Sequence, residues 1–326
     1  MMAKSSLSAC YAFDDNYAPF ALVSLRSLLT FNSSDIIEVV YILGSNLSGD
    51  VLNRFSLICD QSGVECKYID VAHYIEYFQR YFSTPIVPNA SYAAYARLLI
   101  PYVTSGDNNI LYLDCDTLVL GSLADLADYD FQNSSVAAVE DLPSTADKSG
   151  IKSRISGSYV NSGVLLFNKD YLSECVLEKL LPISFDTSNL VFGDQDLINL
   201  QFNGEFAILN RSYNCQPYYY EFKRSELMNL FYGDSQPLEE VDIRVSDAET
   251  AGLNPIVIHF CHSPFGRPWE KFSFDSMSGL WWGYVRESDG VIIDTRRSLR
   301  LLVNRIAFMM LGRRRASRIL NARLMG

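Results

Sequence analysis

Two carboxylates stand one residue apart at the end of an apolar run in the segment ILYLDCDTLVLGSL, residues 110–123. The four apolar residues that precede Asp114 and Asp116 are typical of a fully buried strand. At a strand end, a D-x-D pair can bind one divalent cation whose other ligands are phosphate oxygens and water. Alone, the pair favours a simpler interpretation, a turn in which one Asp accepts backbone hydrogen bonds. The surrounding sequence must decide between a metal site and a turn.

The first part of the chain alternates strand-like and helix-like runs. Strands are expected at residues 7–13, 36–43, 64–69 and 109–113, and helices at 18–31, 48–62 and 91–103. This alternation predicts an α/β fold whose central sheet is mostly parallel. Ligand sites in such sheets lie beyond the carboxyl ends of the strands, which is where Asp114 and Asp116 stand.

The second part is less regular. Strands are expected within 134–141, 158–168 and 254–262, and a helix begins within 193–202. The stretch 211–250 is rich in Tyr, Glu and Asp and is expected to be loop and surface. A boundary near residue 270 predicts two parts, a catalytic domain over 1–270 and a basic helical tail over 271–326.

The charge distribution also separates a body from a tail. After Asp294 there are nine arginines, no lysine and no acid. Without these nine of its 27 bases, the remainder carries 38 acids and 18 bases, a net charge of −20. Such an acidic body excludes a general nucleic-acid surface, which needs clustered Lys and Arg. Arginines among apolar residues are typical of interfacial helices, so the tail is expected to lie on an anionic membrane surface; the alternative is a helix that packs on the body or on a partner chain.

The remaining composition places the chain in the cytoplasm. The seven cysteines are scattered without a C-x-x-C pair, so reduced and mostly buried thiols are expected. No run of 18 apolar residues is present, and the first residues lack the pattern of a signal peptide. With the basic tail, this predicts a cytoplasmic protein attached peripherally to the inner face of the cytoplasmic membrane.

Six segments in order carry a family resemblance: YAFDDNYAPF, YARL, LYLDCDTLV, NSGVLLFN, DQDLIN and a late His followed by GRPW. Over residues 8–270 the chain resembles glycosyltransferase family 8, the retaining sugar-nucleotide transferases that include bacterial lipopolysaccharide galactosyltransferases and glycogenin. The resemblance implies a GT-A-like nucleotide-binding domain, a UDP-sugar donor and a metal ion. Mn²⁺ is expected in preference to Mg²⁺, because an imidazole beside two carboxylates suits the softer ion.

The resemblance also assigns residues. The implied metal ligands are Asp114, Asp116 and His259. The residues implied to line the donor sugar near its anomeric carbon, and so to be catalytic, are Asn161, Asp194 and Gln195. The residues implied to bind the donor, in addition to the two acids, are Ala12, Asp14, Asn16, Arg97, Cys115, Asp141 and Arg267. Taken singly, several of them fit turns, helix caps or surface charges equally well.

Three positions depart from the family pattern. Arg267 stands where the family usually has Lys, and a guanidinium can grip a phosphate bidentately. The spacing from His259 to Arg267 is longer than usual, with His262 inside the insertion. Asp141 is offset from the expected acid, and Glu140 competes for its place.

The function expected is transfer of galactose or glucose from UDP-galactose or UDP-glucose to a hydroxyl of a glycan or lipid-linked saccharide in cell-surface polysaccharide synthesis. Front-face attack by the acceptor is favoured over a covalent intermediate on Asp194 or Gln195. One alternative is a glycogenin-like enzyme that glucosylates itself or another protein. Another is a sugar-nucleotide-binding module without activity, which would be expected to lose one of the metal acids.

Overall fold

The computed structural model describes residues 5–81, 92–104, 108–173, 190–232 and 239–324. Its main sheet has seven strands in the order β3-β2-β1-β4-β7-β6-β8. The strands are β1 (Leu7–Ala12), β2 (Ile37–Gly44), β3 (Glu65–Asp70), β4 (Asn109–Leu113), β6 (Val136–Glu140), β7 (Val160–Phe167) and β8 (Ala207–Ile208). The first four pair in parallel, whereas β7 runs antiparallel to both β4 and β6. The predicted α/β fold with a mostly parallel sheet is confirmed.

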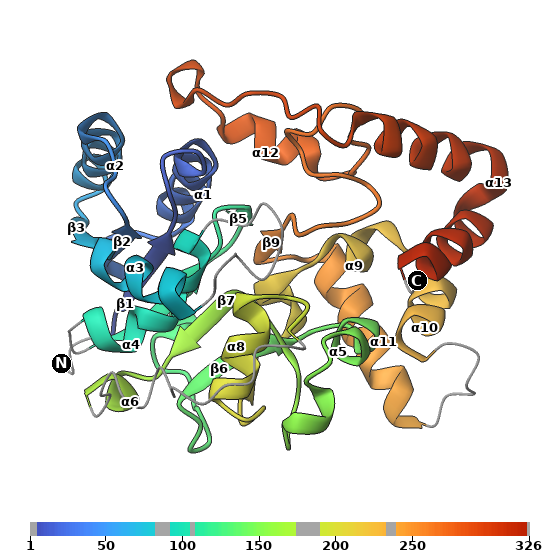
Figure 1. Cartoon of the computed structure of the whole chain (residues 1–326), viewed down its shortest axis with the longest axis horizontal. Helices are drawn as coiled ribbons and strands as arrows, with labels where there is room; N and C mark the ends of the chain where they lie inside the picture. The colour runs from blue at the N-terminus through green and yellow to red at the C-terminus, as the bar shows by residue number, and fades with distance from the viewer. Residues whose placement is uncertain (1–4, 82–91, 105–107, 174–189, 233–238, 325–326) are drawn as a thin grey trace.

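Apolar side chains cover both faces of this sheet, whose strands are drawn as arrows in Figure 1. On one face, α1 (Ala18–Phe31) and α2 (Gly49–Gln61) bury Leu22 and Phe55 against β1 and β2. On the other face lie the 3₁₀ helix η1 (Tyr92–Leu99) and α8 (Asp194–Gln201). The segment 91–103 was expected to be one helix, but α4 (Ile100–Val103) follows η1 separately, because Pro101 lacks the N–H that a continuous helix requires.

A two-stranded sheet lies beside the main one. Strand β5 (Thr117–Val119) pairs antiparallel with β9 (Val257–His259), and Thr117 faces His259 across the pair. β9 is the strand expected near 254–262. Its pairing matters for the site, because it brings His259 next to the segment that carries Asp114 and Asp116.

The prediction that 211–250 is loop and surface is wrong. The segment forms η4 (Arg211–Asn214), α9 (Pro217–Glu221), α10 (Arg224–Tyr232) and α11 (Glu239–Leu253). Its aromatic residues are buried in a cluster of their own, among them Tyr219 and Phe231. The guanidinium of Arg211 lies over both rings and pairs with Glu140 and Asp247. Tyrosine was counted as a surface residue, whereas here its ring supplies core area.

Residues after 270 contact the body before the last helix begins. α12 (Ser278–Tyr284) packs Trp281 near Phe20 of α1, and Arg26 pairs with the buried Asp289. α13 (Ser298–Leu324) then runs along the upper right of the molecule in Figure 1. The division at residue 270 stays a prediction, although residues 271–297 contact the body. Among the described residues, no helix is long and apolar enough to cross a membrane.

Short helices complete the described elements. They are α3 (Ala72–Tyr81), η2 (Ala124–Leu126), α5 (Pro143–Lys148), η3 (Lys152–Arg154), α6 (Lys169–Ser173) and η5 (Glu287–Asp289).

Candidate active site

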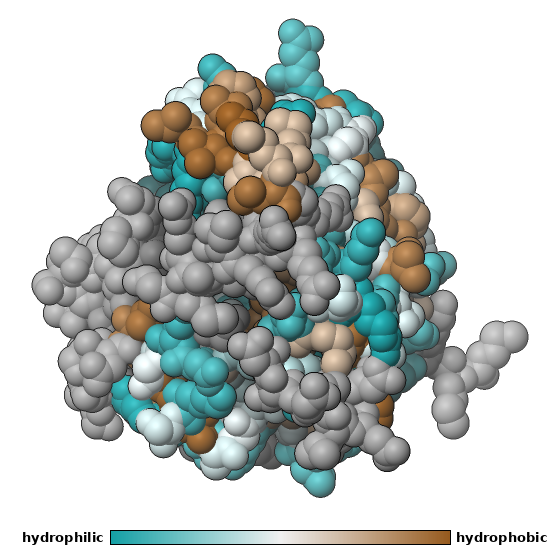
Figure 2. All heavy atoms as spheres, turned by 90° about the vertical axis from the view of Figure 1, so that its right-hand side faces the viewer, coloured by the Kyte–Doolittle hydropathy of each residue, from teal (hydrophilic) through white to brown (hydrophobic). Residues whose placement is uncertain are grey.

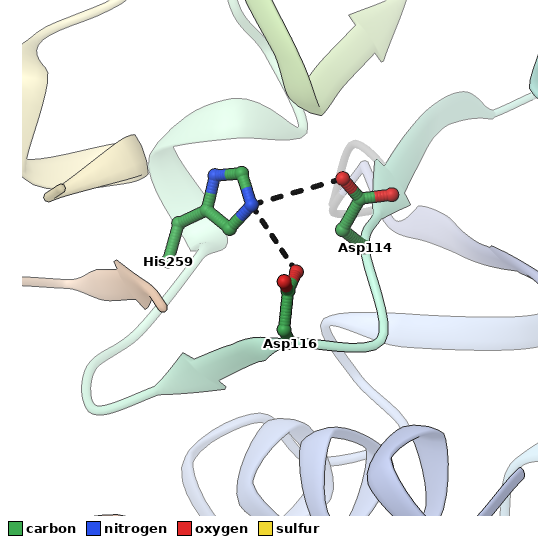
Figure 3. A group of neighbouring side chains, drawn as sticks. All are labelled: Asp114, Asp116 and His259. Atoms are coloured by element: carbon green, nitrogen blue, oxygen red, sulfur yellow. Dashed lines mark ion pairs between the residues drawn. The ribbon is translucent and has the colours of Figure 1, made fainter. Parts of the chain in front are cut away.

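The two carboxylates of the D-x-D segment and one imidazole converge between the two sheets (Figure 3). Asp114 follows β4, Asp116 precedes β5, and His259 ends β9. His259 Nε2 lies 3.1 Å from Asp116 Oδ1 and 3.7 Å from Asp114 Oδ2. The structure therefore brings together all three residues that were expected to bind a metal.

Hydrogen bonds that involve two asparagines, Asn214 and Asn161, fix the orientation of the His259 ring. Its Nδ1 lies 3.0 Å from Asn214 Oδ1, while Asn214 Nδ2 donates to Asn161 Oδ1. Because Asn214 presents its oxygen, Nδ1 donates a proton to it and Nε2 points toward the acids. A bound cation would displace the proton from Nε2, so that its lone pair would serve as a ligand. Gly163 lies against the ring, where an added Cβ would be 2.1 Å from His259 Cε1.

The donor atoms fit a divalent cation. One ligand atom from each of the three residues can be chosen so that all lie within 4.8 Å of one another. Adjacent ligands of an octahedral ion at about 2.1 Å are themselves about 3 Å apart, close to the separations around His259. Two oxygens and one nitrogen suit Mn²⁺ at least as well as Mg²⁺. The residues present therefore fit the implied metal.

In the absence of a metal ion, positively charged side chains offset the negative charge of the carboxylates in this cluster. Burial lowers the pKa of His259, but the carboxylates of Asp116 and Asp114 outweigh burial and raise it overall. Burial raises the pKa of Asp116, and His259 with Arg267 lowers it overall. Arg267 Nη2 lies 3.4 Å from Asp116 Oδ2. Asp116 thus stays ionised and available as a ligand.

Arg97 joins the metal acids to the catalytic candidates. Its Nη2 is 2.8 Å from Asp114 Oδ1, and its Nε is 3.0 Å from Asp194 Oδ2. Nη1 donates to the carbonyl and hydroxyl of Ser162, and the guanidinium lies over the Tyr112 ring. Every nitrogen of Arg97 is engaged, so this buried residue holds two carboxylates at a fixed separation.

A network of amides surrounds Asp141. Gln195 Nε2 and Asn161 Nδ2 donate to Asp141 Oδ2, and Gln216 Nε2 donates to Oδ1. Gln195 Oε1 in turn accepts from Asn161 Nδ2 and from the N–H of Ser162. Of the two competing acids, Asp141 therefore joins the candidate residues. Glu140 instead forms an ion pair with Arg211.

A cavity of about 170 Å³ opens beside the metal cluster. Its lining includes seven of the predicted residues: Ala12, Asp14, Arg97, Asp114, Cys115, Asp116 and Arg267. Asn16 is exposed and not part of this lining, and Asp14 Oδ1 accepts hydrogen bonds from the N–H groups of Asn16 and Tyr17 at the start of α1. Asp14 thus caps a turn and also faces the cavity.

Sequence reasoning missed several residues of the site. Tyr112 donates its hydroxyl proton to Asp114, Ser162 anchors Arg97, and Asn214 orients His259. Tyr112 and Ser162 stand next to predicted residues, which could have drawn notice to them. Asn214 stands in the segment 211–250, which was predicted to be surface. The β-bridge pairing of Cys215 with Ile258 brings it next to the site.

Comparisons with known proteins agree with this geometry. The family model described as glycosyl transferase family 8 matches residues 9–272. Glycosyltransferase GlyE of Streptococcus pneumoniae is 25% identical over 299 residues, which are 90% of this chain and 64% of that protein. Lipopolysaccharide 1,2-glucosyltransferase of Escherichia coli is 28% identical over 243 residues, 71% of this chain and 70% of that protein. The chain thus spans less than two thirds of the length of GlyE.

Solved structures share the fold. A crystal structure of the galactosyltransferase LgtC with donor and acceptor sugar analogues superposes with a TM-score of 0.63 at 21% identity. The match covers 90% of this chain and 99% of LgtC. At this identity the likeness establishes the fold.

Proposed function

The chain belongs to glycosyltransferase family 8, and we propose that it transfers galactose or glucose from a UDP-sugar to a hydroxyl group of an acceptor in cell-surface polysaccharide synthesis. The observation that carries the proposal is the cluster of Asp114, Asp116 and His259 beside a cavity that Arg267 also lines. Three ligands for a divalent cation and a guanidinium together suit a diphosphate. The acceptor we propose is a saccharide, soluble or linked to a lipid.

Some of these residues act on the phosphate side of the bond between the anomeric carbon and UDP, and others act on its sugar side. Asp114, Asp116 and His259 would hold Mn²⁺, and a bound divalent cation supplies positive charge that stabilises a departing diphosphate. Arg267 would bind the same phosphates from the side of Tyr17. As the bond from the anomeric carbon to UDP breaks, negative charge grows on the phosphate side, so fixed positive charge there lowers the barrier.

On the sugar side, the hydrogen-bond network favours front-face attack by the acceptor. The side-chain amide of Gln195 is fully hydrogen-bonded, because its oxygen accepts two hydrogen bonds and its nitrogen donates two. Asp194 is held by Arg97 and by the Ser162 hydroxyl. These contacts hold both side chains in place and reduce the nucleophilicity of their oxygens, so we assign both to positioning the donor sugar. The departing phosphate would take the proton of the acceptor hydroxyl.

The alternative of self-glucosylation finds little support. Tyr218 and Tyr219, two of three consecutive tyrosines, are buried, and the Tyr220 hydroxyl donates to Asp275. An acceptor tyrosine would have to reach the donor cavity from solvent. Other exposed tyrosines keep this alternative testable by intact-mass measurement after incubation with UDP-glucose.

A donor screen tests the proposal. We expect the full chain with Mn²⁺ to release UDP from UDP-galactose or UDP-glucose, and we expect Asp116→Asn to lose this release together with metal-dependent UDP binding. Asp128→Asn, an exposed acid on a loop, serves as the control and should retain both. Full UDP release by Asp116→Asn, or by wild type in excess chelator, would contradict the metal-dependent mechanism.

We also propose that the basic tail, taken from the start of α13, attaches the protein to an anionic membrane surface. One face of α13 places Leu301, Asn304 and Phe308 on the body, and Asn304 Nδ2 donates to the Pro264 carbonyl. The opposite face exposes a stripe at helical spacing: Leu299, Val303, Ile306 and Met310. Figure 2 views the side of the molecule on which α13 lies, and apolar side chains gather there. An apolar stripe on an arginine-rich helix suits the boundary between lipid headgroups and acyl chains.

Removing positive charge from the tail tests its proposed attachment to a membrane. Changing Arg313, Arg314 and Arg315 to Gln should weaken sedimentation with anionic liposomes about 100-fold, since each base near an anionic leaflet is worth about 1 kcal/mol. UDP release should be unchanged. A control with Lys67, Lys152 and Lys223 changed to Gln, all exposed on the body, should bind as the wild type does. Equal binding by the tail variant would assign α13 to packing alone.

A further inference from the structure

The insertion between His259 and Arg267 places a histidine beside the first turn of α13. The next residue, Ser263, accepts a hydrogen bond from Arg297 Nη2 through its carbonyl. His262 reaches the surface, yet desolvation of its ring, followed by the positive charges of Arg297, Arg267 and Arg300, lowers its pKa to about 3. These guanidiniums come from two separate segments, the loop before Trp269 and the start of the last helix. We call His262, Arg267, Arg296, Arg297 and Arg300 the basic rim.

Acids within the described residues neutralise the basic rim only in part. Arg297 Nη1 donates to both carboxylate oxygens of the buried Glu270, Arg296 pairs with Asp294, and Arg267 pairs with Asp116. Burial nevertheless lowers the pKa of Arg297 overall, with help from Arg267 and Arg300. Among the described residues, no acid forms an ion pair with Arg300. A surplus of positive charge therefore remains.

Arg296, Arg297 and Arg300 lie at the N-terminus of α13, where helices usually carry acidic residues. A helix N-terminus carries partial positive charge and normally attracts acidic residues, yet the first turn of α13 contains no acid. The Nε atoms of Arg267 and Arg297 are buried and have no hydrogen-bond partner in the described structure. Clustered cations with unused donors are costly to the folded protein unless an anion completes them.

The basic rim adjoins the donor cavity and the apolar stripe. Arg267 lines the cavity, and the charge of Arg296 acts on both Arg267 and the cavity residue Tyr17. On the other side, Leu299 is 76% exposed next to Arg300 and begins the stripe on α13. A ligand with its phosphate on the rim could thus place a sugar toward the donor cavity and an apolar chain along the stripe.

We propose that the basic rim binds a phosphate ester of the acceptor, beside the diphosphate of the donor. Arg300 and Arg296 supply charge, and His262 supplies an imidazole N–H that donates to a phosphate oxygen. Arg267 faces the donor and marks the border between the two phosphate sites. This inference rests on the proposed function, since it names the acceptor of the same site.

The test fills the donor site first, so that a second anion must find another place. Full-length protein is saturated with UDP and Mn²⁺ and then titrated with glucose 1-phosphate by calorimetry. In a parallel arm it is sedimented with phosphatidylcholine vesicles that contain phosphatidic acid, and with vesicles in which phosphatidylglycerol supplies the same charge. The basic tail should bind both vesicle types, so only tighter binding to phosphatidic acid counts as occupation of the basic rim. We expect saturable binding of glucose 1-phosphate or this preference for phosphatidic acid, and the preference alone would identify a lipid phosphate. Failure of UDP itself to bind would count against the proposed function instead.

Two variants locate the site. His262→Asn combined with Arg300→Gln should weaken the phosphate affinity about 10-fold to 100-fold, since hydrogen bonds to charged groups contribute about 1.5–3 kcal/mol. UDP binding should stay unchanged. Arg305→Gln removes another exposed charge further along α13, so it should keep the wild-type affinity for glucose 1-phosphate and the wild-type preference for phosphatidic acid. Absence of both kinds of binding in the wild type, or an equal loss of either in Arg305→Gln, would overturn the basic rim as a phosphate site.

Discussion

Replacing Asp275 by Asn should stabilise the protein at neutral and alkaline pH. Asp275 is 5% exposed and stands in the loop between Arg267 and α12. Its Oδ2 accepts from the Tyr220 hydroxyl and its Oδ1 from the Met277 N–H. Burial raises the pKa of Asp275 to about 7, and the nearby carboxylate of Glu221 raises it further, against the lowering effect of Tyr220.

The magnitude follows from the difference between folded and unfolded pKa values. The folded state holds the proton of Asp275 up to about pH 7, whereas the unfolded chain releases it near pH 4. Between these values the folded state binds more protons, so the free energy of unfolding falls as pH rises, by about 1.4 kcal/mol per pH unit. The contribution is fully present below pH 4, and about 4 kcal/mol of it is lost by pH 8. Asn resembles the protonated acid and does not titrate.

Urea denaturation at a series of pH values measures this effect. We expect Asp275→Asn and wild type to have similar stability near pH 4, and the variant to be more stable by about 4 kcal/mol at pH 8. Asp289→Asn is the control, because that buried acid pairs with Arg26 and its loss should cost about 3 kcal/mol without any gain at high pH. If Asp275→Asn were less stable than wild type at pH 8, the buried carboxylate would not be the source of the loss.

Two further changes probe the site itself. Arg97→Lys keeps one positive charge but cannot hold Asp114 and Asp194 together, so kcat of UDP release should fall about 100-fold while the melting temperature shifts little; an unchanged kcat would contradict the bridging role. Gly163→Ala would displace the His259 ring and should weaken Mn²⁺ binding in calorimetry about 10-fold to 100-fold, whereas Gly279→Ala, whose added Cβ meets no atom within 4 Å, should bind Mn²⁺ normally.

The fold was largely predictable because its core strands are long apolar runs between helices of clear period. The strands expected around 109–113 and 158–168 appear as β4 and β7. Their antiparallel pairing was not predictable, since periodicity reports which side chains are buried and not which strand lies next to which. The error over 211–250 has another cause: Tyr219 and Phe231 belong to a satellite core that amphipathic patterns do not reveal.

The candidate site also contains residues that the sequence predicts and residues that it does not. Asp114, Asp116 and Arg97 stand on or beside the early parallel strands, where local pattern and family resemblance both point to them. His259 was assigned with an irregular spacing, and only the pairing of β9 with β5 brings it to the acids. Asn214 could not be found at all, because its role depends on a contact between segments 45 residues apart.

The charges of the site suggest how its parts depend on one another. Without a cation, Asp116 lies between His259 and Arg267, and Asp114 is held by Arg97. The charges of His259 and Arg267 keep the buried Asp116 ionised, because a buried charge without a partner would be costly. A ligand ion that takes over Asp116 leaves Arg267 without its acid, at the wall of the cavity where a diphosphate would lie. Metal and donor should therefore bind with positive coupling, since each replaces a contact that the other removes.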